Sequence, residues 1–134
     1  MKLPSPNTEP LDDSARTDAL SPARNQFLAS LIGPEPVFHL QITQTKLDVG
    51  AWFFKQPVCA GMLEDELLLF APGKLPYVER VPFGELSQSE YNHVTGEVVL
   101  APFEGTRVSS LKMPPLEGLQ VLAQIRRGGQ HGTA

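Results

Sequence analysis

Residues able to carry out catalysis are few and widely spaced in this 134-residue chain. The histidines are His39, His93 and His131, the last of them in a glycine-rich tail. His39 and His93 could form an acid–base or metal site with a carboxylate such as Glu90, but a half-exposed histidine on a strand is the commoner arrangement. The sequence has no G-x-S-x-G elbow, phosphate loop or H-E-x-x-H pair. We therefore expect no enzyme activity, no catalytic residues, no metal and no cofactor.

Two further groups with reactive side chains are better explained as structure. Glu64, Asp65 and Glu66 could hold a divalent ion, but such a cluster also makes a well-hydrated hairpin turn, which we expect here. Cys59 lies inside an apolar run, where cysteine is usually a small core residue. Because it is the only cysteine, it excludes an intramolecular disulfide and a cysteine-rich metal site.

The aromatic residues are the best candidates for binding. In an extended segment, Phe53 points away from the face shared by Trp52 and Phe54. One of these faces can be core, and the other must be covered by the chain's own N-terminal helix, by a partner or by a second copy. We interpret Trp52, Phe54, Tyr77 and Tyr91 as the partner-binding surface.

Charge limits the kinds of partner. The chain carries 11 basic and 15 acidic residues, a formal net charge of −4, so it lacks the basic footprint of a nucleic-acid binder. The charge gives equally little support to peripheral contact with anionic membranes. The N-terminus has no apolar signal segment, and no run approaches the roughly 18 apolar residues of a membrane span. We expect a cytoplasmic protein.

Two N-terminal segments precede the main domain. Residues 1–20 are rich in proline and small polar residues and are expected to be a disordered tail. Residues 21–33 are expected to form a short helix, with Ser21 as N-cap, Pro22 at its first position and Gly33 at its end. Its apolar face either caps the domain's own core or binds a partner. That face comprises Phe27, Leu28, Leu31 and Ile32.

From residue 37 the apolar residues recur with the period of a strand. Turn residues such as Asp48–Gly50, Glu64–Asp65 and Thr95–Gly96 separate the segments. Seven or eight short strands at this spacing are typical of an all-β fold. The expected strands cover 37–43, 51–55, 58–63, 66–70, 77–81, 91–94, 97–100 and 106–111.

The apolar period changes to that of a helix after Pro114 and Pro115. The stripe from Leu116 to Ile125 is expected to close the sheet, although Gly118 should weaken the helix by about 1 kcal/mol relative to alanine. Residues 128–134 are expected to be a frayed tail. The sequence thus predicts a mainly β fold with a C-terminal capping helix over residues 37–127.

Three motifs in this order carry a family resemblance. Gly61–Phe70 resembles the "G-x-L-x-(T/D)-x-x-L-hydrophobic-F" hairpin of bacterial pleckstrin-homology-like and GRAM-like domains. Arg80–Leu86 is similar to their "x-I-P-hydrophobic-x-(D/E)-I" segment, and the closing helix occupies the position of theirs. The resemblance implies a bent seven-stranded barrel or two-sheet sandwich capped by that helix. An immunoglobulin-like sandwich, the alternative fold, needs no terminal helix.

The resemblance does not extend to phosphoinositide binding. Family members that bind these lipids place several basic residues around the first hairpin, whereas this chain has only Lys46 and Lys55 there, with Asp48 between them.

The function expected is that of a non-enzymatic module that binds a protein or peptide, self-association included, most simply by strand addition at a sheet edge. The alternative is a carrier that holds a small ligand or lipid in the barrel interior. A carrier requires a vacant cavity where the Leu116–Ile125 stripe would otherwise pack.

Overall fold

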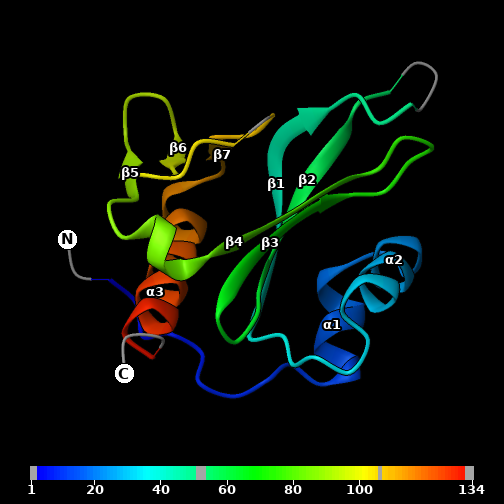
Figure 1. Cartoon of the computed structure of the whole chain (residues 1–134), viewed down its shortest axis with the longest axis horizontal. Coiled ribbons are helices and arrows are strands. Elements are labelled where there is room, and N and C mark those ends of the chain that lie inside the picture. Colours follow the sequence, from blue (N-terminus) through cyan, green and yellow to red (C-terminus); the bar gives the residue numbers. More distant parts are fainter. Residues whose placement is uncertain (1–2, 51–53, 106, 132–134) are drawn as a thin grey trace.

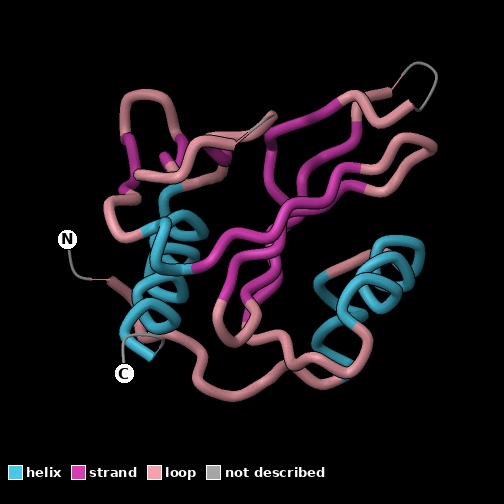
Figure 2. The backbone as a smooth tube through the Cα atoms, viewed as in Figure 1, coloured by secondary structure: helices cyan, strands magenta, loops and turns pink. Residues whose placement is uncertain are grey.

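The computed structural model describes residues 3–50, 54–105 and 107–131. Within these ranges, loops connect the helices and strands (Figure 2). The elements are α1 (Asp13–Ala19), α2 (Pro22–Ile32), β1 (His39–Leu47), β2 (Gln56–Met62), β3 (Glu66–Ala71), β4 (Tyr77–Pro82), the 3₁₀ helix η1 (Phe83–Leu86), β5 (Glu90–Asn92), β6 (Glu97–Val99), β7 (Ser110–Lys112) and α3 (Pro115–His131).

The first sheet has the order β1-β2-β3-β4, with every neighbouring pair antiparallel. β2 and β3 form the expected hairpin around Glu64 and Asp65, with Met62 opposite Leu67. Of the strand expected over 51–55, residues 51–53 lie outside the described ranges, and Phe54 and Lys55 belong to no strand.

The second sheet has the order β5-β6-β7 and is also antiparallel. It lies beside the first sheet where β7 approaches β1, and there the Lys112 amide donates to Thr45 Oγ1 at 2.8 Å. No ladder joins the two sheets into a closed barrel in the described part of the chain. The expectation of a β-rich fold with a C-terminal helix is confirmed in this form: seven described antiparallel strands in two sheets, with α3 packed beside them (Figure 1).

Both faces of β3 are buried, which explains its unbroken apolar run. Leu67 and Leu69 face a cluster that includes Val121, Leu122 and Ile125 of α3. Leu68 and Phe70 face a second cluster, which α2 covers. Burial on both sides removes the alternation of apolar and polar residues that marks a half-exposed strand.

Helix α2 forms as the sequence predicts and caps the domain's own core. The Ser21 side chain accepts a hydrogen bond from the Arg24 amide, and Gly33 ends the helix with φ of 57°, a conformation that favours glycine. Leu28 is fully buried, and the Phe27 ring stacks on Phe70 with 6.2 Å between ring centroids. The apolar face of α2 therefore lies against β3.

The expectation that residues 1–20 are a disordered tail is wrong for the described residues. The segment runs from beside α3 to α1 (Figure 1), where Asp12 caps the helix by accepting from the Ala15 amide at 2.8 Å. Asn7 donates its amide to Gln124 Oε1 at 2.7 Å and its side chain to the Phe38 carbonyl at 2.6 Å. Leu20, at the end of α1, is buried in the α2 cluster. These few side chains hold a segment whose overall composition favours disorder.

The C-terminal end also differs from expectation. α3 continues to His131, so residues 128–131, expected to fray, are helical. Gly128 lies so close to Phe83 that a Cβ there would overlap the aromatic ring. This contact holds the end of α3 against η1. None of the helices in the described part of the chain has the length and apolarity to cross a membrane.

Candidate interaction surface

The loops that join β1 to β2 and β3 to β4 lie together at one end of the first sheet (Figure 1). The Leu75 amide donates to the Val49 carbonyl at 2.9 Å and so ties one loop to the other. Asp48 accepts from the Gly50 amide at 3.0 Å, and Gly50 takes a positive φ of 79° against the β3–β4 loop. The two loops therefore form one surface.

Three large apolar side chains at this end are exposed. The exposed fraction is 72% for Phe54 and 71% for Leu75, one in each loop, and 42% for Val78, the second residue of β4. We call Phe54, Leu75 and Val78 the loop-end residues. Lys55 and Lys74 beside them are exposed as well. Exposed apolar side chains with charged residues around them are typical of an interaction site.

β4 is an edge strand, paired with β3 on one side. Among the described residues, no backbone hydrogen bond links Tyr77–Val81 to a segment other than β3. Its outer N–H and C=O groups are thus available to a further strand. Leu75 and Val78 lie at the start of this edge.

A hollow of about 360 Å³ lies beside the same loop, between it and α2. It is lined by Ala23, Gln26, Phe27, Ser30, Pro72 and Gly73. A partner chain that continues past the β3–β4 loop would contact this hollow, whose lining residues are all uncharged.

Of the residues expected to bind a partner, Phe54 is exposed. Trp52 lies outside the described residues. Tyr77 is only 5% exposed, and Tyr91 is half-buried. Of the three described residues, only Phe54 therefore presents its aromatic side chain to a partner.

Tyr77 is held inward by several contacts. Its hydroxyl donates to Glu79 Oε1 at 2.6 Å, and the Arg107 guanidinium lies over its ring. Burial, reinforced by the carboxylate of Glu79, raises the pKa of Tyr77 well above its ordinary value near 10. A partner cannot reach this side chain without disturbing the core.

Tyr91 is equally committed to the fold. Its hydroxyl donates to the Met113 carbonyl at 2.8 Å, and its ring makes an edge contact with His93. A Cβ at Gly118 would lie 2.5 Å from Tyr91 Cδ1, so the absence of a side chain at Gly118 lets the ring pack on α3. Tyr91 thus joins β5 to the helix.

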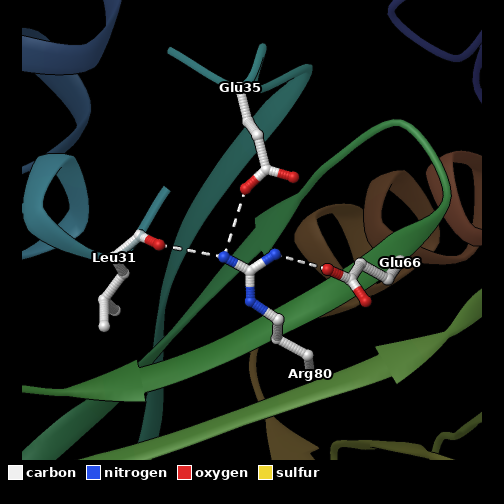
Figure 3. Close-up of polar contacts among 4 residues, drawn as sticks. All are labelled: Leu31, Glu35, Glu66 and Arg80. Atoms are coloured by element: carbon white, nitrogen blue, oxygen red, sulfur yellow. Dashed lines mark hydrogen bonds and ion pairs between the residues drawn. The ribbon is translucent and has the colours of Figure 1, made fainter. Parts of the chain in front are cut away.

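Arg80, on β4, is a structural junction (Figure 3). Its guanidinium bonds Glu66 of β3 at 2.5 Å, Glu35 at 3.1 Å and the Leu31 carbonyl at 2.9 Å. The carboxylates of Glu66 and Glu35 raise the pKa of Arg80 further. Since Leu31 lies in the last turn of α2, Arg80 fixes the end of that helix beside β4. This junction leaves Glu66 engaged in an ion pair.

The side chains considered for catalysis are not assembled into a site. No hydrogen bond or ring contact links His39 to His93 or Glu90 in the described ranges. No group of three or more potential metal ligands occurs among the described residues. Cys59 is fully buried, and burial raises the pKa of its thiol to about 11. Its thiol is therefore protonated near neutral pH, consistent with a core residue.

His39 gives a prediction for the pH dependence of stability. Its Nε2 atom is buried without a hydrogen-bond partner among the described residues, and burial lowers its pKa below the usual 6.5. The unfolded chain binds the proton more readily, so stability should fall as pH drops below about 6.5, by at most about 1.4 kcal/mol per pH unit. Urea unfolding at several values between pH 7 and 5 measures this loss.

The matched variant for this prediction is His39→Gln, which cannot titrate. Its free energy of unfolding should fall less than that of the wild type over the same pH range. Equal losses in the two proteins would show that His39 is not the titrating group.

Comparison with protein-family models, with curated proteins and with solved structures gave no match for this chain. The function proposed for it therefore rests on its own residues.

Proposed function

We propose that this chain is a non-enzymatic module that binds a protein or peptide by strand addition to β4, with side-chain contacts at the loop-end residues. The observation that carries the proposal is the exposure of Leu75 and Val78 at the start of β4, whose outer edge has no backbone partner among the described residues. The loop bonded to that of Leu75 adds the exposed Phe54. A β-strand added along Tyr77–Val81 would gain main-chain hydrogen bonds. The loop-end residues would supply the apolar contact that selects the partner.

The free energy of binding favours strand addition to β4 together with side-chain burial at the loops over side-chain burial alone. Full burial of a Phe or Leu side chain contributes about 1.5–3 kcal/mol each. Association itself costs an estimated 4–15 kcal/mol, so Phe54 and Leu75 alone would give weak binding. The backbone groups of β4 supply the further contacts that a stable complex needs.

The charges along β4 make the edge selective. Glu79 is partly buried, and Arg80 is exposed but tied to Glu35 and Glu66. Charged side chains on an edge strand suppress pairing with arbitrary strands. The partner strand must therefore tolerate these charges, which excludes a purely apolar segment.

A pleckstrin-homology-like scaffold is the fold assignment we propose with this function. Its support is the order of elements: four strands, three strands and a closing helix. A carrier that holds its ligand in the interior of the fold gains no support, because Val121, Leu122 and Ile125 fill that interior as part of the core.

The test is affinity capture from a lysate of the native host, with bound proteins identified and quantified by mass spectrometry. Four proteins are compared: wild type, Phe54→Asp/Leu75→Asp, Trp52→Ala and Val94→Asp. Val94 is the matched control, since it is 95% exposed but lies in the second sheet's β5–β6 turn. Light scattering on each protein detects self-association.

The double variant should lose a captured protein, or the self-associated form, by at least about tenfold, because aspartate would have to be desolvated in an apolar contact. Val94→Asp should behave as wild type. Phe54→Asp/Leu75→Asp and Val94→Asp should keep their stability within about 0.5 kcal/mol, because the three substituted side chains are exposed. Capture and oligomeric state unaffected by the double variant would refute the proposed surface.

A further inference from the structure

A second hollow lies at the opposite end of β4, between η1 and the last turns of α3. Its volume is about 350 Å³, within the range of small-molecule pockets. The lining is mainly apolar. It comprises Phe83, Gly84, Leu86, Ser87, Ile125, Arg126 and Gly129.

The walls of this hollow are fixed by the fold. The Phe83 amide donates to the Asp65 carbonyl at 3.1 Å, and the Phe103 amide donates to the Glu85 carbonyl at 3.0 Å. These bonds hold η1 from two sides. On the other wall, Gly128 packs directly on the Phe83 ring. The fold therefore holds the described walls of the hollow in place.

Two glycines keep the hollow open. A Cβ at Gly84 or at Gly129 would meet no described atom within 4 Å. Gly129 lies in α3, where alanine is about 1 kcal/mol more favourable in a helix interior. Its place in the lining means that a side chain there would occupy space now open to a ligand.

Arg126 supplies an uncommitted positive charge in this lining. It is exposed, and no hydrogen bond, ion pair or ring contact engages it among the described residues. The neighbouring Arg127 differs, since its guanidinium lies 4.3 Å from the Phe38 ring centroid and donates to the Leu63 carbonyl. Of these two arginines, Arg126 is the one free to bind a ligand.

We propose that this hollow binds a small amphiphile with one carboxylate and a short hydrocarbon chain. The chain would lie against Phe83, Leu86 and Ile125, which are already largely desolvated. The carboxylate would accept the paired N–H groups of Arg126, a geometry that favours carboxylates. Ser87 also belongs to the lining, and its hydroxyl would supply a further donor to the same group.

The sign of the local charge supports an anion. The C-terminal end of a helix carries the equivalent of about −0.5 charge, which opposes an anion near Gly129. The full positive charge of Arg126 outweighs it. Glu85 lies on the same turn as Gly84 but does not line the hollow. A cationic amphiphile is therefore disfavoured, and this distinction can be tested.

The test uses the full chain, isotopically labelled for NMR, with sodium octanoate as the probe. Octylammonium and 1-octanol are the charge controls. Octanoate should bind saturably in the millimolar range, as expected for so small a ligand, and should shift the amide signals of residues 83–87 and 125–129. Octylammonium should bind at least about threefold more weakly.

Two variants distinguish the contribution of the Arg126 charge from that of the hollow itself. Arg126→Gln should weaken octanoate binding about three- to tenfold and leave octanol binding unchanged. Gly129→Leu should fill the hollow, weaken both ligands at least about tenfold and keep the fold, since no described atom obstructs a Cβ there. Phe54→Asp/Leu75→Asp should leave octanoate binding unchanged, so this inference and the proposed function fail independently.

The proposal is overturned if octanoate shows no saturable binding, or if the shifted signals lie elsewhere on the chain. It is equally overturned if octylammonium binds as tightly as octanoate, or if Gly129→Leu folds and still binds octanoate with wild-type affinity.

Discussion

Replacing Leu28 by alanine is expected to lower the free energy of unfolding by about 2–5 kcal/mol, the usual cost of truncating a buried leucine. Leu28 has no exposed surface and contributes to the cluster formed with Leu68 and Phe70 of β3. Because domains of this size are stable by only about 5–15 kcal/mol, the loss would be a large fraction of the total. The result would establish that α2 belongs to the cooperative core.

Urea unfolding followed by far-ultraviolet circular dichroism measures this effect. Gln26→Ala is the matched control, since Gln26 is an exposed residue of the same helix and alanine favours helices. Its free energy should stay within about 0.5 kcal/mol of the wild type. A loss below about 1 kcal/mol for Leu28→Ala, or a separate early transition for the helix, would mean that α2 is only loosely attached to the sheet.

The turns and strands were predictable because local chemistry determines them. Gly50 and Gly96 adopt positive φ values, which glycine tolerates best, and both lie where the sequence predicts turns. Gly33 ends α2 in the same way. Between such residues, the short apolar runs had room only for strands. Seven of the expected segments overlap strands in the described part of the chain.

The N-terminal segment shows where composition fails. Its proline-rich sequence predicts disorder on average, but order depends on a few specific contacts. Asn7 bonds both Gln124 and the Phe38 carbonyl, and Leu20 is buried. A polar residue whose hydrogen-bond partner is 117 positions away carries no local sign of that contact.

The candidate surface was predicted only in part, because the two faces of β4 are covered to different extents. Tyr77 shares the α3 face with Ala71, and Val78 points to the α2 face with Phe70. A strand pattern separates the two faces but does not say how far each is covered. The pattern therefore favours Tyr77, which is buried, and does not indicate the exposed Val78. Leu75 was missed because its loop was recognised from Gly73 and Pro76, which do not reveal an exposed leucine.

Glycines in α3 were also misread from sequence. From sequence, Gly118 only weakens the helix, whereas in the structure it allows the close approach of Tyr91. Helix propensity describes an isolated helix, and tertiary contact can reverse its sign. The adjacent pair Gly128 and Gly129 offers the sharpest test of this point.

Gly128→Ala is expected to lower the free energy of unfolding by about 1–3 kcal/mol, the usual cost of overpacking, although alanine is the better helix former. A Cβ there would overlap the ring of Phe83, which is buried and cannot turn into solvent. Gly129→Ala is expected to act in the opposite direction, with a gain of up to about 0.5–1 kcal/mol. Its Cβ would meet no described atom within 4 Å.

Urea unfolding of the two variants beside the wild type decides the matter, since each change adds the same methyl group to neighbouring positions of one helix. The double variant Gly128→Ala/Phe83→Leu provides a further check, because a smaller side chain at position 83 should recover part of the loss. If both single variants raised the stability, helix propensity alone would govern this end of α3. The helix would then not lie against η1, and the hollow between them would lose one wall.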